Sequence, residues 1–349
     1  MNITLTFLAF SGPSGSPFFS SRFQNALFFG INVFKLSHPL IISKSRFHLG
    51  KSRLCGFLSS ILVLEGKSTI SDDYFSSGLQ ATESAIVSSD ETIVNHCIFF
   101  RCSSKYGGGI MSSHCLEFRS CCFDLCRGFI SGQAVFAIDG NITGNHSTIV
   151  RCSKPSSPGN QSPLVFRCIQ LSLRHFNVSH NYVTQSVAII LVQSFRVSFI
   201  DFFNMYQNKD GFYGGSLYFY KGDYSTELSY GNIVSNPIMP TYSLIWIDSI
   251  DTHIVFSKCI FMQNTPGSYV RKGLMSGLPH FRNCIFDDES VVITGCQTIN
   301  CVFNQKNIET HCLLFLNTAH CENYIQVFPN RFPILIQVSL QFTYFIIDV

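Results

Sequence analysis

Cysteine and histidine, the side chains that most often bind zinc, crowd one short stretch of this sequence. Cys97 and Cys102 precede Cys121-Cys122-Phe123-Asp124-Leu125-Cys126, and His96 and His114 stand close by. Structural zinc needs ligands that converge tetrahedrally, usually in cysteine pairs separated by two to four residues. The spacing here places Cys97 and Cys102 on different sides of a bend, so we expect no metal site and no cofactor.

Acidic residues are the second group that could do chemistry, because cleavage of a glycosidic bond uses two carboxylates. Asp287-Asp288-Glu289 is the obvious cluster, with Arg282 nearby and Arg271-Lys272 earlier in the chain. The cluster falls on a predicted turn, where solvated carboxylates are ordinary, and no Gly-His-Gly or Asn-Thr-Asp signature of the polygalacturonase type is present. We assign no catalytic residue, and a carbohydrate-active enzyme (polysaccharide lyase or hydrolase) is the alternative function.

The same cysteines belong to an internal repeat. Cys97-Ile98-Phe99-Phe100-Arg101-Cys102 recurs at Cys121 to Cys126 and as Cys259-Ile260-Phe261-Met262-Gln263-Asn264. Shorter copies follow at Cys284-Ile285-Phe286 and Cys301-Val302-Phe303. The final Cys or Asn recurs every 24 to 29 residues, at positions 102, 126, 152, 181, 208, 236 and 264. Such a period indicates one supersecondary unit per repeat, stabilised by stacking on its neighbours.

The repeat segments alternate apolar and other residues, as in Cys97-x-Phe99, and Gly, Ser and Asn bound them. This pattern indicates short strands rather than helices. The leucine-and-asparagine consensus of leucine-rich repeats is missing. We predict an all-β parallel β-helix of roughly nine to eleven coils over residues 45–325, with a leader or cap at 1–44 and an apolar tail at 326–349.

Stacked coils turn repeated positions into columns of like side chains, spaced by roughly 4.8 Å. We expect one inward column of aromatic rings: Phe99, Phe123, Phe261, Phe286 and Phe303. A second inward column contains Cys97, Cys121, Cys259, Cys284 and Cys301, and a third, at a bend, contains Cys102, Cys126 and Asn264. Corner glycines are predicted at Gly107, Gly108, Gly214 and Gly215.

The redox state of these columns stays open at the level of sequence. Neighbouring cysteines such as Cys97 and Cys121, at the coil spacing, would lie inside the Cα range that a disulfide allows. A column of reduced, buried thiols is the other reading, because cysteine also behaves as a small hydrophobe. The chain has 15 cysteines, so at least one thiol has no partner within the chain.

Two motifs carry a resemblance to a known family. Phe261-x-x-Asn264, with Phe99-x-x-Cys102 as a variant, and the GG-x-[IL] segments from Gly107 and Gly214 resemble the repeats of polymorphic outer membrane proteins. Cysteine-rich surface proteins of protist parasites look similar. The resemblance covers roughly residues 93–306. It implies a right-handed, pectin-lyase-like β-helix that is displayed on a cell surface and serves adhesion.

Composition limits the class of partner. Charged residues make up 13% of the chain and the net charge is +3 without a basic cluster, which excludes nucleic acid. Five sequons, at Asn2, Asn141, Asn145, Asn160 and Asn177, suit a cell-surface or extracellular protein. The segment from Phe332 to Val349 is apolar but interrupted by polar residues, and membrane association through it is a marginal prediction.

A cluster of aromatic residues is the best candidate binding surface. The stretch DGFYGGSLYFYKGDY contains Tyr213, Tyr218, Tyr220 and Tyr224, and Trp246 follows in another alternating strand. Tyrosine offers a rigid side chain with an apolar body and a polar tip. We therefore expect a non-enzymatic surface or structural module that binds a host protein or a glycan through exposed tyrosines.

Overall fold

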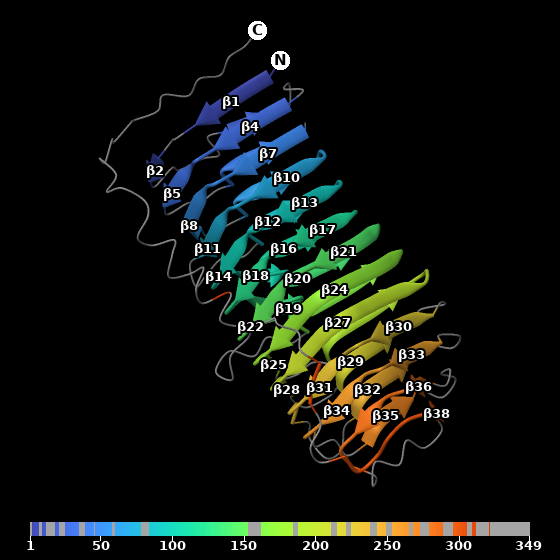
Figure 1. Ribbon diagram of the computed structural model, residues 1–349. Helices are drawn as coiled ribbons and strands as arrows, with labels where there is room; N and C mark the ends of the chain where they lie inside the picture. Colours follow the sequence, from blue (N-terminus) through green and yellow to red (C-terminus); the bar gives the residue numbers. More distant parts are fainter. Residues whose placement is uncertain are drawn as a thin grey trace.

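The structure, a computed structural model, describes residues 2–6, 9–11, 18–20, 25–34, 39–44, 46–57, 60–77, 84–152, 162–183, 188–210, 215–220, 225–237, 243–248, 253–264, 268–272, 279–288, 296–305, 309–311 and 321. In this part of the chain the elements are strands stacked in parallel (Figure 1), in one sheet of 23 strands, one of 11 and two of 2. The predicted parallel β-solenoid is confirmed.

The 23-stranded sheet has two rows. The first row contains β1 Asn2–Thr6, β4 Asn25–Phe29, β7 Arg46–Gly50, β10 Ser68–Ser71, β13 Thr92–Asn95, β17 Leu116–Arg119, β21 Asn141–Asn145, β30 Thr226–Ser229, β33 Ile254–Ser257, β36 His280–Arg282 and β38 Gln297–Ile299. The second row contains β2 Ala9–Ser11, β5 Asn32–Phe34, β8 Arg53–Phe57, β11 Tyr74–Ser77, β14 Ile98–Phe100, β18 Cys122–Asp124, β22 Thr148–Val150, β31 Asn232–Val234, β34 Ile260–Met262 and β37 Ile285–Phe286. Two longer strands, β24 Gln170–Ser179 and β27 Ser198–Tyr206, run through both rows.

The 11-stranded sheet forms the remaining wall. It contains β3 Phe18–Ser20, β6 Ile41–Ser43, β9 Leu62–Leu64, β12 Ile86–Ser88, β16 Ile110–Ser112, β20 Val135–Ile138, β23 Leu164–Cys168, β26 Ala188–Ser194, β29 Gly215–Tyr220, β32 Ser243–Asp248 and β35 Ser268–Lys272. Two short pairs, β15 Ser103–Tyr106 with β19 Arg127–Ser131 and β25 Tyr182–Val183 with β28 Lys209–Asp210, follow the second row. Among the described residues no helix is long and apolar enough to cross a membrane.

The stack begins upstream of the boundary predicted at residue 45. Strand β1 pairs in register with β4, and β4 pairs with β7. These N-terminal strands show the same alternation as later ones; in β4, for example, Ala26 and Phe28 are buried and their neighbours are more exposed. Residues 326–349, predicted as a tail, lie outside the described residues.

Two corners per coil are made by single residues with left-handed backbone conformation. The first corner separates the two rows, and its non-glycine members have φ between 49° and 57°: Lys51, Asp72, His96, Ser120, His146, His175, Phe202, Tyr230, Lys258, Asn283 and Asn300. The second corner ends the second row: Arg101, Leu125, Arg151, His180, Gln207, Ser235 and Gln263. A left-handed conformation costs about 1–2 kcal/mol per L-residue, so each corner needs compensating contacts.

Glycine is required at one corner of the 11-stranded sheet. Gly107 has φ +57°, and a Cβ atom there would lie 2.1 Å from the carbonyl oxygen of Ile110. A Cβ atom on Gly108 would lie 2.4 Å from the carbonyl oxygen of Gln133 in the next coil. The left-handed backbone and the tight local turn therefore require Gly107, and the close approach of the neighbouring coil requires Gly108. Gly215 begins β29, and Gly214 lies outside the described residues.

Candidate functional site

The first predicted cysteine column lies inside the solenoid, directly after the first corner of each coil. The Cys121 thiol lies 3.3 Å from the carbonyl oxygen of Arg119 and 3.4 Å from that of Val94 in the preceding coil. Cys97, Cys259, Cys284 and Cys301 make the same pair of contacts. Burial raises the pKa of Cys121 to about 12. The thiol is therefore a protonated donor that helps to close the corner.

The predicted aromatic column also lies inside, but as two separate stacks. The ring of Phe99 stacks on Phe75 at 4.9 Å between centroids and on Phe123 at 4.7 Å. Farther along, Phe286 stacks on Phe261 at 4.8 Å and on Phe303 at 5.1 Å. The register places four aliphatic side chains between the stacks: Ile149, Val178, Met205 and Ile233. Within this column, ring stacking is therefore confined to the coils of Phe75 to Phe123 and of Phe261 to Phe303.

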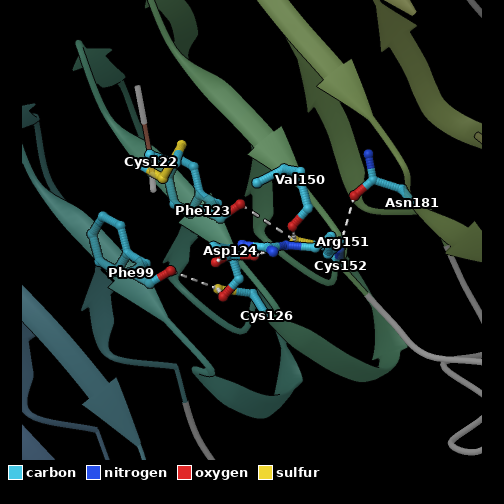
Figure 2. A network of polar contacts seen from close by, with 10 residues as sticks. Phe99, Cys122, Phe123, Asp124, Cys126, Val150, Arg151, Cys152 and Asn181 are labelled. Atoms are coloured by element: carbon cyan, nitrogen blue, oxygen red, sulfur yellow. Dashed lines mark hydrogen bonds and ion pairs between the residues drawn. A yellow bond between two sulfur atoms is a disulfide. The ribbon is translucent and has the colours of Figure 1, made fainter. Parts of the chain in front are cut away.

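The column at the second corner changes from thiol to amide along the axis (Figure 2). The Cys126 thiol donates to the carbonyl oxygen of Phe99, and the Cys152 thiol donates to that of Phe123. From Asn181 onward an amide does the same, with Asn181 Nδ2 donating to Ile149 O at 3.1 Å. The amide also accepts, because Asn181 Oδ1 receives the Cys152 N–H at 2.9 Å. Asparagine thus keeps the donor of cysteine and adds an acceptor.

Consecutive asparagines in this column bond to one another. Asn208 Nδ2 donates to Val178 O and to Asn236 Oδ1, and its Oδ1 accepts from Asn181. Asn236 repeats the pattern with Asn264, whose Nδ2 donates to Ile233 O at 2.7 Å. Asn208 and Asn236 are therefore each bonded to an asparagine in both neighbouring coils.

We expect Asn208→Ala to lower the free energy of unfolding by about 3 kcal/mol, because it leaves several buried groups unpaired. Asn208→Cys should lower the free energy of unfolding by less, since a thiol can donate to Val178 O as Cys152 does to Phe123 O. Urea unfolding of the three proteins measures the difference. An alanine variant that loses less than about 1 kcal/mol would contradict a role for the ladder in stability.

Asp73 is an unusual member of the first column, between Ser52 and Cys97. Its side chain is fully buried, and Oδ1 accepts the Ser52 N–H at 2.6 Å. Oδ2 is buried with no hydrogen-bond partner in the described structure. Burial, with a smaller contribution from Asp72, holds the pKa of Asp73 well above its usual range. The fold therefore favours the protonated form of this carboxyl group over the carboxylate.

This raised pKa predicts a pH dependence. Above about pH 4 the unfolded chain ionises Asp73 while the folded chain keeps its proton, so stability falls as pH rises toward the folded pKa, by on the order of 1 kcal/mol per unit. Asp73→Cys, which matches Cys97 and Cys121, should remove this dependence. Urea midpoints at pH 5 and pH 7.5 test it: an equal change with pH in both proteins would show that Asp73 does not store a proton.

Neighbouring cysteines in these columns do not form the disulfides that the coil spacing allowed. Among the described residues no group of three or more His, Cys, Asp or Glu side chains is placed to hold a metal ion. Cys97, Cys102, Cys121 and Cys126 are free thiols. The disulfide in the described part of the chain joins Cys122 to Cys321, which are 199 residues apart in sequence.

The outer face of the second row, which carries Cys122, is covered. Side chains there point away from the core, yet Ile98 is 2% exposed and Asn177 is 1% exposed. Cys321 packs against this face through its disulfide, with the two Cα atoms 5.6 Å apart. His311 exchanges two hydrogen bonds of 3.0 Å with Asn232 on the same face. Residues late in the chain therefore lie against coils formed much earlier.

An ion pair stabilises the second corner near this disulfide (Figure 2). Asp124 is fully buried, and Arg151 donates from Nε to Oδ1 at 2.9 Å and from Nη2 to Oδ2 at 2.6 Å. Arg151 has φ +52°, and Asp124 belongs to the preceding coil. The two-point contact therefore fixes a strained corner residue to its neighbour.

The outer face of the 11-stranded sheet carries the main aromatic cluster, which we call the aromatic face. Its members are Tyr106, Met111, Phe136, Ile138, Val165, Tyr218, Tyr220 and Trp246. Alternation in β29 and β32 directs Leu217, Phe219, Ile245 and Ile247 into the core and leaves the tyrosines and Trp246 outside. Both faces of a parallel sheet are usually packed against something, so an apolar outer face is a candidate contact surface.

Contacts across neighbouring strands order the aromatic face. The Tyr218 ring lies 4.9 Å from Trp246 and 5.6 Å from Tyr220 between centroids. The Arg271 guanidinium lies 4.9 Å from the Trp246 ring centroid, and Tyr218 Oη donates to Asp248 at 3.3 Å. Burial, and the Asp248 charge, raise the pKa of Tyr218. The face therefore combines rigid rings with one cation and one carboxylate.

The structure brings together only part of the predicted tyrosine set. Tyr218 and Tyr220 lie on the aromatic face, while Tyr213 and Tyr224 lie outside the described residues. The structure adds Phe136 and Tyr106 from earlier coils, which pack at 5.3 Å between centroids. Sequence reasoning missed these two because the candidate surface was sought within one continuous stretch rather than across the coil register.

One member of the predicted acidic cluster, Asp287, contacts the second corner of the preceding coil. Asp287 Oδ2 accepts the backbone N–H of Gln263, a corner residue of the preceding coil. Arg271 instead lies over Trp246, on the 11-stranded sheet. Glu289 lies outside the described residues. Asp287 and Arg271 thus make their described contacts at two different places, the second corner and the 11-stranded sheet.

A second aromatic row was not predicted. First-corner residues of four consecutive coils stack in sequence, with centroid distances of 4.5 Å for His146–His175, 5.0 Å for His175–Phe202 and 4.9 Å for Phe202–Tyr230. Lys258 continues the row 4.7 Å from the Tyr230 ring centroid. Each of these residues immediately precedes a position of the first inward column. The repeat spacing could therefore have predicted this second row.

Fold and surface together define the class: a parallel β-solenoid with a packed interior of thiols, amides and rings and with one aromatic outer face. Comparison with known proteins adds no closer identity, since no protein-family model, no curated protein and no solved structure matches the chain.

Proposed function

We propose that this chain is a non-enzymatic surface or structural module that binds a protein or glycan partner, in the manner of an adhesin, through its aromatic face. The observation that carries the proposal is the packing of Tyr218, Tyr220 and Trp246 on the outer side of a parallel sheet. Tyrosine and tryptophan are the side chains most enriched at the energetic centres of binding interfaces.

The rest of the solenoid supports a binding role rather than a catalytic one. Four of the cysteines that suggested chemistry, Cys97, Cys102, Cys121 and Cys126, donate to backbone carbonyl oxygens inside the core. Cys122 is joined to Cys321, and Asp287 accepts a backbone hydrogen bond. The Phe261-x-x-Asn264 motif and the glycine segment from Gly107, which resemble those of polymorphic outer membrane proteins, stand at columns and corners of the coils. We extend to this chain the adhesion and surface display that the resemblance implies.

The proposed location is the cell surface or the extracellular space. The Cys122–Cys321 disulfide supports it, because disulfides persist mainly in oxidising compartments. Most of the other described cysteines are buried thiols, to which an oxidant has little access. Membrane association through residues 326–349 stays a prediction.

Binding to arrays of immobilised glycans, and to surface proteins extracted from target cells, tests the proposal. The double variant Tyr220→Ala/Trp246→Ala should bind at least about tenfold more weakly than the original chain. Phe202→Ala is the matched control, since Phe202 is 36% exposed and lies at the first corner, between the two rows of the 23-stranded sheet rather than on the 11-stranded sheet. We leave Tyr218 unchanged because it is only 7% exposed and holds the other rings.

Two results would overturn the proposal. One is binding that the double variant retains in full. The other is cleavage of a polysaccharide by the original chain that Asp287→Asn abolishes, which would instead establish the carbohydrate-active alternative.

A further inference from the structure

The sequons of this chain differ in how far the fold buries their side chains. A sequon is an asparagine followed two residues later by Ser or Thr, and both side chains must be read by the enzyme that attaches a glycan. Asn141, Asn145 and Asn177 fall in well-described strands, β21 and β24. The side chains of Asn2 and Asn160 lie outside the described residues. The three described sequons can therefore be compared directly.

Asn177 is closed to modification in the folded chain. It is 1% exposed, and its Nδ2 donates to Ser179 Oγ at 3.2 Å, so the two side chains of the sequon bond to each other. Its Oδ1 accepts from Asn204 Nδ2 at 2.9 Å. A glycan on Asn177 Nδ2 would remove these bonds and would have no room on the covered outer face of the second row.

The sequon of Asn145 is partly closed. Asn145 is only partly exposed, and its Oδ1 is buried without a hydrogen-bond partner. Ser147 is fully buried in the first inward column, where its Oγ donates to Asn145 O at 3.0 Å and accepts the Cys121 N–H at 3.1 Å. The hydroxyl of this sequon is thus part of the core.

Asn141 differs from both. Asn141 and Thr143 are exposed, and Ile142 between them is 1% exposed, so alternation presents the two sequon side chains together on the outer face of the first row. Asn141 follows Gly140, a left-handed corner residue at φ +71°. We infer that Asn141 carries an N-linked oligosaccharide, with Thr143 as the recognised hydroxyl, and that this glycan lies on the first-row face.

The chemistry is an ordinary glycosyl transfer. Nδ2 of Asn141 forms a bond to the anomeric carbon of a polyprenyl-diphosphate-linked oligosaccharide, and the bond between that carbon and the diphosphate oxygen breaks. The diphosphate-linked lipid leaves with the electron pair, and Nδ2 gives one proton to a base of the transferring enzyme. No electron is gained or lost.

The inference rests on the proposed export of the chain. It adds which face of the solenoid carries the glycan and which face is left for a partner. The glycan would occupy the outer face of the first row, where Glu117 and Thr143 are neighbours in register. The aromatic face belongs to the other sheet. A bulky, hydrophilic group on the first row would keep that face from associating and leave the aromatic face as the one available for a partner.

Peptide mapping of the full chain, purified from its own cells, tests this site. Trypsin releases residues 128–151 with Asn141 and Asn145, and residues 175–196 with Asn177. Amidase release of N-glycans in ¹⁸O water should convert Asn141 to ¹⁸O-labelled Asp, leaving Asn145 and Asn177 unlabelled. Thr143→Ala should abolish the label and Thr143→Ser should retain it.

Labelling of intact cells by an antibody separates the two proposals. A chain that is labelled at the surface but carries no glycan at Asn141, or carries one at Asn145 or Asn177 instead, overturns the inference and leaves the proposed function standing. A chain that is neither labelled at the surface nor glycosylated overturns both.

Discussion

Phe123→Ala should lower the free energy of unfolding by about 3–5 kcal/mol. Phe123 is fully buried, stacks on Phe99 at 4.7 Å and meets Phe118 edge-on at 6.2 Å between centroids. Removal of the ring forfeits these contacts and opens a cavity. Backbone hydrogen bonds fix the spacing of the coils on both sides, so the walls have little freedom to collapse into the space.

The aliphatic part of the same column supplies the control. Ile149 occupies the equivalent position one coil later, so Phe123→Ile should cost clearly less than Phe123→Ala. Urea unfolding gives the free energies, and hydrogen exchange should show the loss concentrated in β14, β18 and β22, because repeat stability depends on nearest neighbours. Losses below about 1 kcal/mol in both Phe123→Ala and Phe261→Ala would refute inward stacking.

Much of the interior could be predicted from sequence because the coil repeats its spacing. Phe99 and Phe123 are 24 residues apart and meet in register, and Cys97 and Cys121 do the same. The spacing could not choose between Phe203 and Met205 for the aliphatic stretch, since both suit a core. The register chooses Met205, because Val178 pairs with it and Phe176 pairs with Phe203. Right-handed winding stays a prediction.

The outer surface was harder to predict because it depends on contacts between distant parts of the chain. Alternation correctly separates Tyr218 and Tyr220 from the core, but it does not show that Phe136 and Trp246 join them. Neither does any local pattern pair Cys122 with Cys321 across 199 residues. Cys122 even stands beside Cys121, and the alternation of side chains along the extended backbone sends one thiol inward and the other outward.

Among single substitutions, loss of the Cys122–Cys321 disulfide should lower the free energy of unfolding the most. In the chain-entropy account, cross-linking two residues 199 positions apart lowers the entropy of the unfolded chain and so stabilises the fold by about 5 kcal/mol. Cys321→Ser should therefore unfold at a clearly lower urea concentration than the original chain, by up to this amount. Cys321→Ala should behave like Cys321→Ser, which would separate loss of the bond from burial of a hydroxyl group.

Reduction distinguishes the bond from the packing around it. Dithiothreitol should lower the urea midpoint of the original chain to that of Cys321→Ser and leave the variant unchanged, because the inward thiols of Cys97 and Cys126 are already reduced. A midpoint that dithiothreitol does not move, together with an unchanged midpoint in Cys321→Ser, would mean that the disulfide does not form in solution. If the disulfide does form, the chain folded in a reducing compartment should be the less stable form, because the buried thiols do not replace the bond, and export should raise its stability.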